Sequence, residues 1–121
     1  KGGIMDKILF LTMLYDFYGE LLTDKQKELF ELHYLNDLSL YEISSEYGIT
    51  RQAVLDTVKR AKNSLIYYEE KLGLIEKYLN RKKFLDKTIN NIENIISNNS
   101  LTKDNISLLS DIKQSLSSLL D

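Results

Sequence analysis

The sequence predicts an all-α fold, in which a helix-turn-helix is followed by a C-terminal helical hairpin. Apolar residues recur every three or four positions, which is the period of an amphipathic helix, and no segment alternates as a β-strand does. The 121 residues include no proline and five glycines, so few positions break a helix. Serine and threonine stand where helices have to begin, and both residues cap helix N-termini.

Five or six helices are expected along the chain. Capping boxes are predicted at Thr23 with Gln26 and at Ser39 with Glu42, because each hydroxyl can accept the backbone N–H three residues further on. Thr50 is a third N-cap. The expected helices are about 6–18, 24–35, 40–47, 51–72, 74–97 and 103–119; Thr102 caps the last, with Ile106, Leu109, Ile112, Leu116 and Leu119 inside.

The segment around Gly48 has the features that a helix-turn-helix requires. Gly48 supplies a residue that tolerates positive φ in the tight turn between two helices. Ile49 follows as an apolar plug, and Ser44 is small where the second helix crosses the first. Ile43 and Val54 are the expected buried anchors of the two helices. These independent requirements coincide within about fifteen residues, which predicts the motif.

Three stretches of this region resemble region 4 of bacterial sigma factors, which binds promoters. They read LTDKQ at 22–26, YLNDLSLYEI at 34–43 and YGITRQAV at 47–54. In length and order of elements, residues 5–90 resemble the small YlxM-type family of helix-turn-helix proteins from Gram-positive bacteria. That resemblance implies a gene neighbourhood with the signal recognition particle GTPase and its receptor. It also implies a role in, or regulation of, that targeting pathway.

In a sigma-like motif, the first turns of the second helix face the major groove of DNA. Arg51 and Gln52 carry groups that can read guanine and adenine. Asp56 repels phosphates, and Leu55 offers only an apolar contact. The candidate residues for binding nucleic acid or a partner are Thr50, Arg51, Gln52, Leu55, Asp56, Lys59, Arg60 and Lys62.

Three kinds of partner are consistent with this face. Lys59, Arg60 and Lys62 favour phosphate contacts, with duplex DNA or with RNA. An exposed Leu55 with charged neighbours favours a protein partner. We expect a non-enzymatic regulatory or accessory protein that contacts protein or RNA of the signal recognition particle. The alternative is a transcription regulator that binds a specific DNA sequence through the second helix.

Charge is distributed unevenly along the chain. Residues 1–49 have four basic and nine acidic side chains, residues 50–90 have ten and five, and residues 91–121 have two and four. A second basic patch in the middle segment is either a solvated helix face or a contact for RNA or an acidic protein. Its members are Lys77, Arg81, Lys82, Lys83 and Lys87.

A run of apolar residues with alternating spacings of three and four forms a possible heptad seam. It is covered either by the first and last helices of the same chain or by a second copy in a homodimer. Helix-turn-helix proteins dimerise to match two half-sites, so a homodimer would favour DNA. The seam consists of Val58, Ala61, Leu65, Tyr68, Leu72, Ile75 and Leu79.

The composition excludes several classes of function. The chain has no cysteine and a single histidine, His33, so no cysteine-ligated or multi-histidine metal site can form. No catalytic constellation and no glycine-rich phosphate loop is present, so we expect no enzyme, cofactor or small-molecule substrate. No apolar stretch approaches the roughly 20 residues that cross a bilayer. No signal peptide is apparent, so we expect a cytoplasmic protein without membrane insertion.

The length predicts one domain. The chain is too short for two cores of normal size, so residues 5–121 are expected to form a single all-α domain. The helix-turn-helix would occupy about 39–72 and the C-terminal helices about 74–120. Residues 1–4, which read KGGI before Met5, resemble the remnant of an expression tag.

Overall fold

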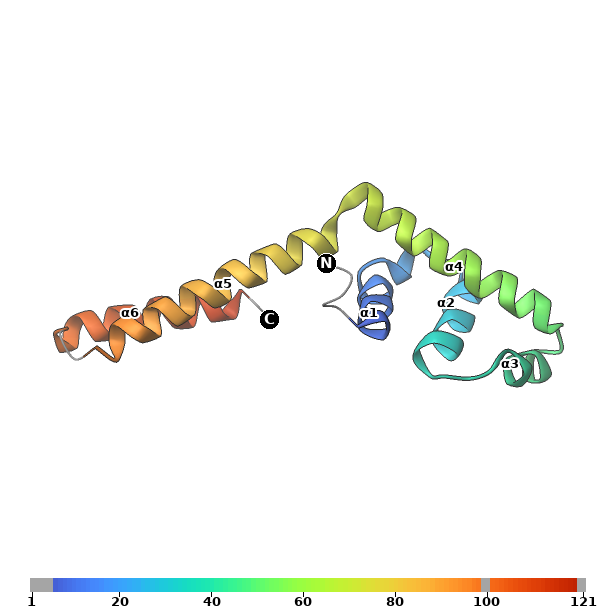
Figure 1. The fold of residues 1–121 in the computed structure, drawn as a ribbon, viewed down its shortest axis with the longest axis horizontal. Helices are drawn as coiled ribbons and strands as arrows, with labels where there is room; N and C mark the ends of the chain where they lie inside the picture. Colours follow the sequence, from blue (N-terminus) through green and yellow to red (C-terminus); the bar gives the residue numbers. More distant parts are fainter. Residues whose placement is uncertain (1–5, 99–100, 120–121) are drawn as a thin grey trace. The chain divides into compact units, whose positions relative to one another are not determined.

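The computed structural model describes residues 6–98 and 101–119, and these residues are mostly helical (Figure 1). The proposed tag remnant at 1–4 lies outside them. The all-α prediction is confirmed. The elements are α1 (Lys7–Tyr18), η1 (Gly19–Leu21), α2 (Asp24–Phe30), η2 (Glu31–Leu35), α3 (Leu40–Tyr47), α4 (Arg51–Leu72), α5 (Leu74–Ile96) and α6 (Lys103–Ser118).

The chain divides into two compact units. The first is Lys1–Ile75 and the second is Glu76–Asp121. The boundary falls just inside α5, so this helix begins in the first unit and continues through the second. Whether the two units behave as the single domain expected over 5–121 stays a prediction.

The long helix α4 organises the first unit. It packs against α1, α2 and α3, and Figure 1 shows it lying across them. Leu29, Ile43, Val54 and Val58 are fully buried where these helices meet. Both predicted anchors of the helix-turn-helix therefore lie in the core. Partly buried apolar side chains surround this cluster: Leu32, Tyr34, Leu38, Leu40, Tyr47 and Ile49.

Side-chain caps start four helices at the residues that the sequence indicated. Thr23 and Ser39 each accept the backbone N–H three residues further on, and Gln26 and Glu42 complete both capping boxes. The Thr50 hydroxyl accepts the Ala53 N–H at 3.0 Å. Thr102 caps α6 in the same way. Each cap satisfies an N–H that has no partner within its own helix.

The predicted heptad seam is largely covered within the first unit. Val58, Ala61 and Leu65 are fully buried, and Ile75 is buried as well. The covering helices are α1, α2 and α3, of which we expected only α1. Leu72 is exposed, because Gly73 takes the left-handed conformation and ends α4 beside it. The seam is thus not available as a continuous dimer interface.

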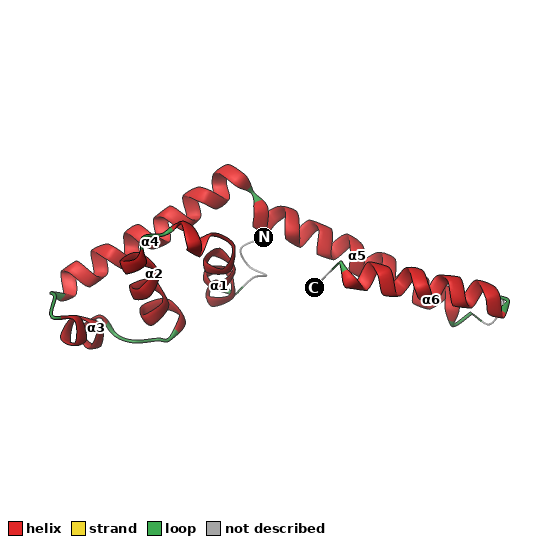
Figure 2. Cartoon of the chain, turned by 180° about the vertical axis from the view of Figure 1, so that it is seen from behind, coloured by secondary structure: helices red, strands yellow, loops and turns green. Residues whose placement is uncertain are grey.

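The second unit is a helical hairpin. Figures 1 and 2 both show α6 folded back along α5. Leu85 and Ile92 of α5 are buried, and Lys113 of α6 pairs with Glu93 of α5 at 3.4 Å. The hairpin prediction is confirmed. Two helices can cover only one stripe on each other, so Ile112 and Leu119, which we expected inside, are exposed.

Candidate nucleic-acid interface

The turn between α3 and α4 positions the candidate binding face. Gly48 has φ 66°, in the left-handed region, and ends α3. The N–H groups of Gly48 and Ile49 both donate to the Ser44 carbonyl, the latter at 3.2 Å. Ile49 packs on the core. The segment between α3 and α4 therefore has the predicted geometry and places the first turn of α4 at the surface. The Thr50 hydroxyl caps this helix by accepting the Ala53 N–H.

The two groups expected to read bases are engaged by the protein itself. The Arg51 guanidinium lies over the Tyr41 ring, 5.0 Å from its centroid. The Gln52 side-chain amide donates to a carboxylate oxygen of Asp56 at 2.9 Å. Neither interaction was anticipated from the sequence. The first turn of α4 consequently presents an amide–carboxylate pair and a stacked guanidinium.

The remaining candidates differ in their availability. The sequence suggested that Leu55 is an exposed anchor. In the structure this side chain is partly buried. The Lys62 ammonium lies over the Tyr34 ring, 5.8 Å from its centroid. Lys59 and Arg60 are exposed and, within residues 6–98 and 101–119, form no hydrogen bond or ion pair. They are the cations most ready for an anionic partner.

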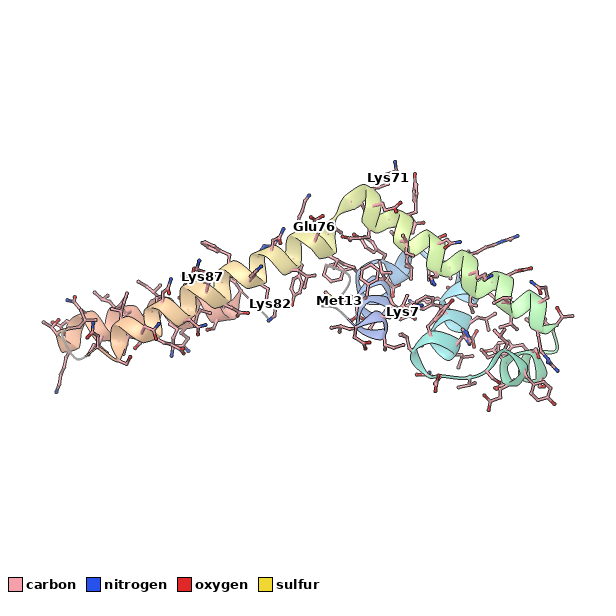
Figure 3. All side chains as sticks on the ribbon, viewed as in Figure 1. Lys7, Met13, Lys71, Glu76, Lys82 and Lys87 are labelled. Atoms are coloured by element: carbon pink, nitrogen blue, oxygen red, sulfur yellow. The ribbon has the colours of Figure 1, made fainter. Side chains whose placement is uncertain are left out.

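A shallow open groove lies further along α4, on the side of this helix that faces α2. Its volume is about 430 Å³. Tyr67 borders it with 54% of the residue exposed, and the Lys71 ammonium is 5.5 Å from the centre of the Tyr67 ring. Figure 3 shows Lys71 projecting from the last part of α4. The groove is lined by Gln26, Arg60, Asn63, Ser64, Tyr67 and Tyr68.

This groove brings Arg60, a candidate named from the sequence, together with residues that the sequence analysis missed, among them Ser64 and Tyr67. Arg60, Ser64, Tyr67 and Lys71 are spaced by four, three and four residues, so they share one side of a helix. An aromatic residue between two cations at that spacing was the available signal. Gln26 gave no such signal, because its place in the groove depends on how α2 packs on α4.

The second basic patch does not gather on one face. Lys77, Arg81, Lys82, Lys83 and Lys87 are all exposed, but their spacing winds them around α5. Figure 3 shows Lys82 and Lys87 projecting to different sides of the helix. Lys82 pairs with Asp86 at 3.4 Å. The arrangement resembles a solvated helix surface more than a single binding site.

Three tyrosines beside the motif have raised pKa values. Burial raises the pKa of Tyr34, so its ring stays neutral beneath Lys62. A hydrogen bond to Glu28 raises the pKa of Tyr47 to about 12 and links α3 to α2. Burial, with the charge of Glu31, raises the pKa of Tyr15. These phenols are neutral at physiological pH and support the motif as hydrogen-bond donors and packing surfaces.

His33 has a structural role. Its Nδ1 is 2.8 Å from the Leu38 carbonyl, an acceptor, so this nitrogen carries the proton. The contact links η2 to the segment before α3. Within the described part of the chain, no three His, Asp or Glu side chains form a group that could hold a metal ion. The helices described are each too short or too polar to cross a membrane.

Comparisons with known proteins agree with the observed motif. The model of a family described as "Putative helix-turn-helix protein, YlxM / p13 like" matches residues 5–106, which include the motif and all of α5. A UPF0122 protein of Thermoanaerobacter sp. (strain X514) is 57% identical over 88 residues, or 73% of this chain and 75% of that protein. One from Caldanaerobacter subterraneus subsp. tengcongensis is 58% identical over 82 residues, 68% of this chain and 70% of its own. One from Listeria innocua is 50% identical over 76 residues, 63% of this chain and 69% of its own.

Proposed function

Since this chain belongs to the YlxM-type helix-turn-helix family, we propose that it is a cytoplasmic, non-enzymatic accessory factor of the signal recognition particle pathway. It binds the RNA of the particle through the groove along α4. The observation that carries this proposal is the placement of Tyr67 between Arg60 and Lys71 on one open side of α4. The link to the particle comes from the gene neighbourhood that the family resemblance implies.

The first turn of α4 supports this proposal because it fits the phosphate backbone of duplex DNA poorly. An exposed pair at i and i+4, such as Gln52 and Asp56, contributes only about 0.2–0.5 kcal/mol, so DNA could break it. Breaking it would leave the Asp56 carboxylate facing the phosphates, however, and like charges repel. Asp56 is a better match for a cytosine amino group than for the DNA backbone.

The groove has the chemistry that single-stranded RNA uses. Unpaired bases stack on aromatic rings, and each stacked base contributes about 1–3 kcal/mol. Tyr67 is 54% exposed, and a base can stack on its ring when the Lys71 ammonium, which lies over that ring, moves to a flanking phosphate. Arg60 is exposed and lines the same groove, where it can contact a second phosphate. Asn63 and Ser64 add hydrogen-bonding groups between these positions. Loops and bulges of a folded RNA present such unstacked bases.

Duplex DNA is the second candidate, and the geometry of the motif favours it. The turn at Gly48 and the cap at Thr50 build the element that other helix-turn-helix proteins insert into the major groove. Arg51 and Lys59 are exposed there. In this alternative the Tyr41–Arg51 contact opens on binding, and the protein regulates transcription.

Binding measurements with paired variants separate these functions. We would compare the affinity of the protein for the RNA of the particle and for mixed-sequence duplex DNA. Tyr67→Ala should weaken RNA binding at least fivefold, whereas Tyr41→Ala, the matched exposed tyrosine of the motif, should leave it unchanged. Loss of DNA binding in Arg51→Ala, with no RNA binding by the wild type, would favour transcription regulation.

A pull-down from a bacterial lysate tests the link to the pathway. With the intact chain as bait, the particle RNA should be recovered without nuclease and lost with it. Capture of the targeting GTPase or its receptor that survives nuclease would instead show a protein contact. Recovery of neither would contradict the link to the signal recognition particle pathway. RNA binding by the groove would then be decided by the affinity measurements alone.

A further inference from the structure

The joint between α4 and α5 consists of a single residue. α4 ends at Leu72, α5 begins at Leu74, and Gly73 between them has φ 63°. Figure 2 shows this joint as a short loop between the two helices. The Gly73 N–H still donates to the Glu69 carbonyl at 2.8 Å, as it would inside a continuous α-helix. The helical hydrogen-bond pattern is therefore interrupted only beyond Gly73.

Side chains take the place of backbone acceptors directly after the joint. In a continuous α-helix, the N–H groups of Leu74 and Ile75 would donate to the carbonyls four residues earlier, at positions 70 and 71. Here the Leu74 N–H donates to the Tyr18 hydroxyl at 3.1 Å, and the Ile75 N–H donates to the Glu69 carboxylate at 3.0 Å. The Tyr18 hydroxyl donates to the same carboxylate oxygen at 2.6 Å. We define Tyr18 and Glu69 as the clamp, because they bind the two N–H groups in place of the carbonyls of α4.

The sequence around the joint is compatible with one continuous helix. The apolar positions 65, 68, 72, 75 and 79 keep spacings of three, four, three and four across it, which is the period of a single helix. Residues 69–77 contain no proline, and Gly73 is the poorest helix former among them. A Cβ at residue 73 meets nothing within 4 Å, so packing does not require glycine there. The break therefore depends on the left-handed conformation of Gly73 and on the clamp.

We propose that the joint is a conformational switch between this broken form and a form in which α4 and α5 are one helix. In the one-helix form Gly73 takes helical φ, and the N–H groups of Leu74 and Ile75 return to the carbonyls at positions 70 and 71. The broken form is the ground state, because Tyr18 and Ile75 are only 1% and 2% exposed in it. This burial is lost when the backbone at Ile75 moves, and lost apolar burial is unfavourable.

The clamp is in contact with the groove along α4. The Tyr68 ring lines the groove and packs 6.1 Å from the Tyr18 ring. The Tyr67 ring, which also borders the groove, is 6.1 Å from the Tyr68 ring. A ligand that needs these rings as the broken form arranges them stabilises that form, and the one-helix form binds it less well. This regulation of the groove rests on the proposed function, whereas the two forms of the joint do not.

Nuclear magnetic resonance of the intact chain tests the switch. Gly73→Ala with Glu69→Ala removes the residue that tolerates positive φ and the acceptor on which the clamp depends. Alanine is disfavoured in the left-handed conformation and favoured in a helix, which together shift the equilibrium about thirtyfold or more toward the one-helix form. We expect helical carbon shifts at residue 73. We also expect a contact between the α-proton of residue 71 and the N–H of Ile75, which a continuous helix brings together.

Gly73→Asn is the matched control, because asparagine tolerates the left-handed region and the clamp stays intact. This variant should keep positive φ at residue 73 and the wild-type shifts of the Leu74 and Ile75 N–H groups. A folded double variant with positive φ at residue 73 would overturn the switch, because the rest of the fold would then fix the break. If the double variant unfolds, Gly73→Ala alone decides: helical φ at residue 73 supports the switch, and positive φ overturns it.

Affinity for the particle RNA tests the link between the joint and the groove. The double variant should bind at least threefold more weakly than the wild type, and Gly73→Asn should bind as the wild type does. Unchanged affinity in a variant with one continuous helix would overturn the link. If the wild type binds no RNA, the proposed function fails, and contacts between the Tyr18 and Tyr68 rings decide the link instead. The link is wrong if those contacts persist in the one-helix form.

Discussion

The Tyr18 hydroxyl donates a 2.6 Å hydrogen bond to the Glu69 carboxylate and so joins α1 to the last turns of α4. Two backbone groups complete this network. The Leu74 N–H donates to the Tyr18 hydroxyl at 3.1 Å, and the Ile75 N–H donates to the same Glu69 oxygen at 3.0 Å. Gly73 ends α4 with φ 63°. The network therefore satisfies the first N–H groups of α5 directly after the break between the two helices.

Tyr18→Phe should destabilise the first unit. The substitution removes the donor to Glu69 and the acceptor of the Leu74 N–H, both in a part-buried site. Leaving such groups without partners costs about 1–3 kcal/mol. Urea unfolding should report this loss. Tyr68→Phe is the control, because the Tyr68 ring packs 6.1 Å from that of Tyr18 and the substitution keeps that packing. Equal losses in both variants would contradict a role for the network.

Stability should fall at strongly alkaline pH through Tyr47. The hydrogen bond to Glu28 raises its pKa to about 12, above the 10.0 of a free tyrosine. A pKa raised in the folded state gives stability that is complete below pH 10 and is lost as the pH rises toward 12. Absorbance at alkaline pH should therefore show a late-ionising component that is smaller in Tyr47→Phe, beside those of the other tyrosines with raised pKa values. An unchanged titration in that variant would assign the late ionisation to another phenol.

Gly48→Ala should destabilise the helix-turn-helix without a steric clash. A Cβ at this position meets nothing within 4 Å, so the cost is the left-handed conformation alone, about 1–2 kcal/mol. Gly48→Asn should cost less, since asparagine and aspartate tolerate this region. Asp37, with φ 64°, is an example in the same chain. Thermal unfolding compares the two variants, and an asparagine variant no better than alanine would point to a different cause.

The Lys59→Glu, Lys62→Glu double variant should weaken any binding to duplex DNA and reduce its salt dependence. Each phosphate contact contributes about 0.9 to the slope of log K against log salt, so losing two lowers the slope by about 2. Lys7→Glu with Lys25→Glu, exposed on α1 and α2, makes the same change in net charge and is the control. Affinity and slope measured from 50 to 200 mM salt report the effect. A double variant with wild-type DNA binding would show that this face does not contact DNA.

Leu55→Asp should leave RNA binding within about twofold of the wild type. The side chain is partly buried beside the first turn of α4, on a different side of the helix from Arg60 and Tyr67. Its replacement removes the apolar anchor that a protein partner would use at the first turn. Fluorescence anisotropy with labelled particle RNA measures the outcome. A large loss in a helical variant would move the binding site to the first turn.

The cap and turn residues made the helix-turn-helix predictable, because their effects are local. A hydroxyl at Ser39 or Thr50 acts on an N–H three residues away, and Gly48 adopts its conformation regardless of distant contacts. The periodicity of α4 likewise identified Val54 and Val58 as core residues. The family resemblance drawn from the same stretches is confirmed by the family match.

The sequence by itself therefore determined which residues form helices, where the helices begin and the presence of the motif. The tertiary structure alone decided which charged and aromatic groups meet: Arg51 with Tyr41, Lys62 with Tyr34, and Tyr18 with Glu69. It also decided that the apolar stripe of Leu108 and Ile112 faces outward. The physical reason is that caps and helical period act within one or two turns of chain. Side-chain partners and uncovered faces depend on how separate helices pack, which no local spacing encodes.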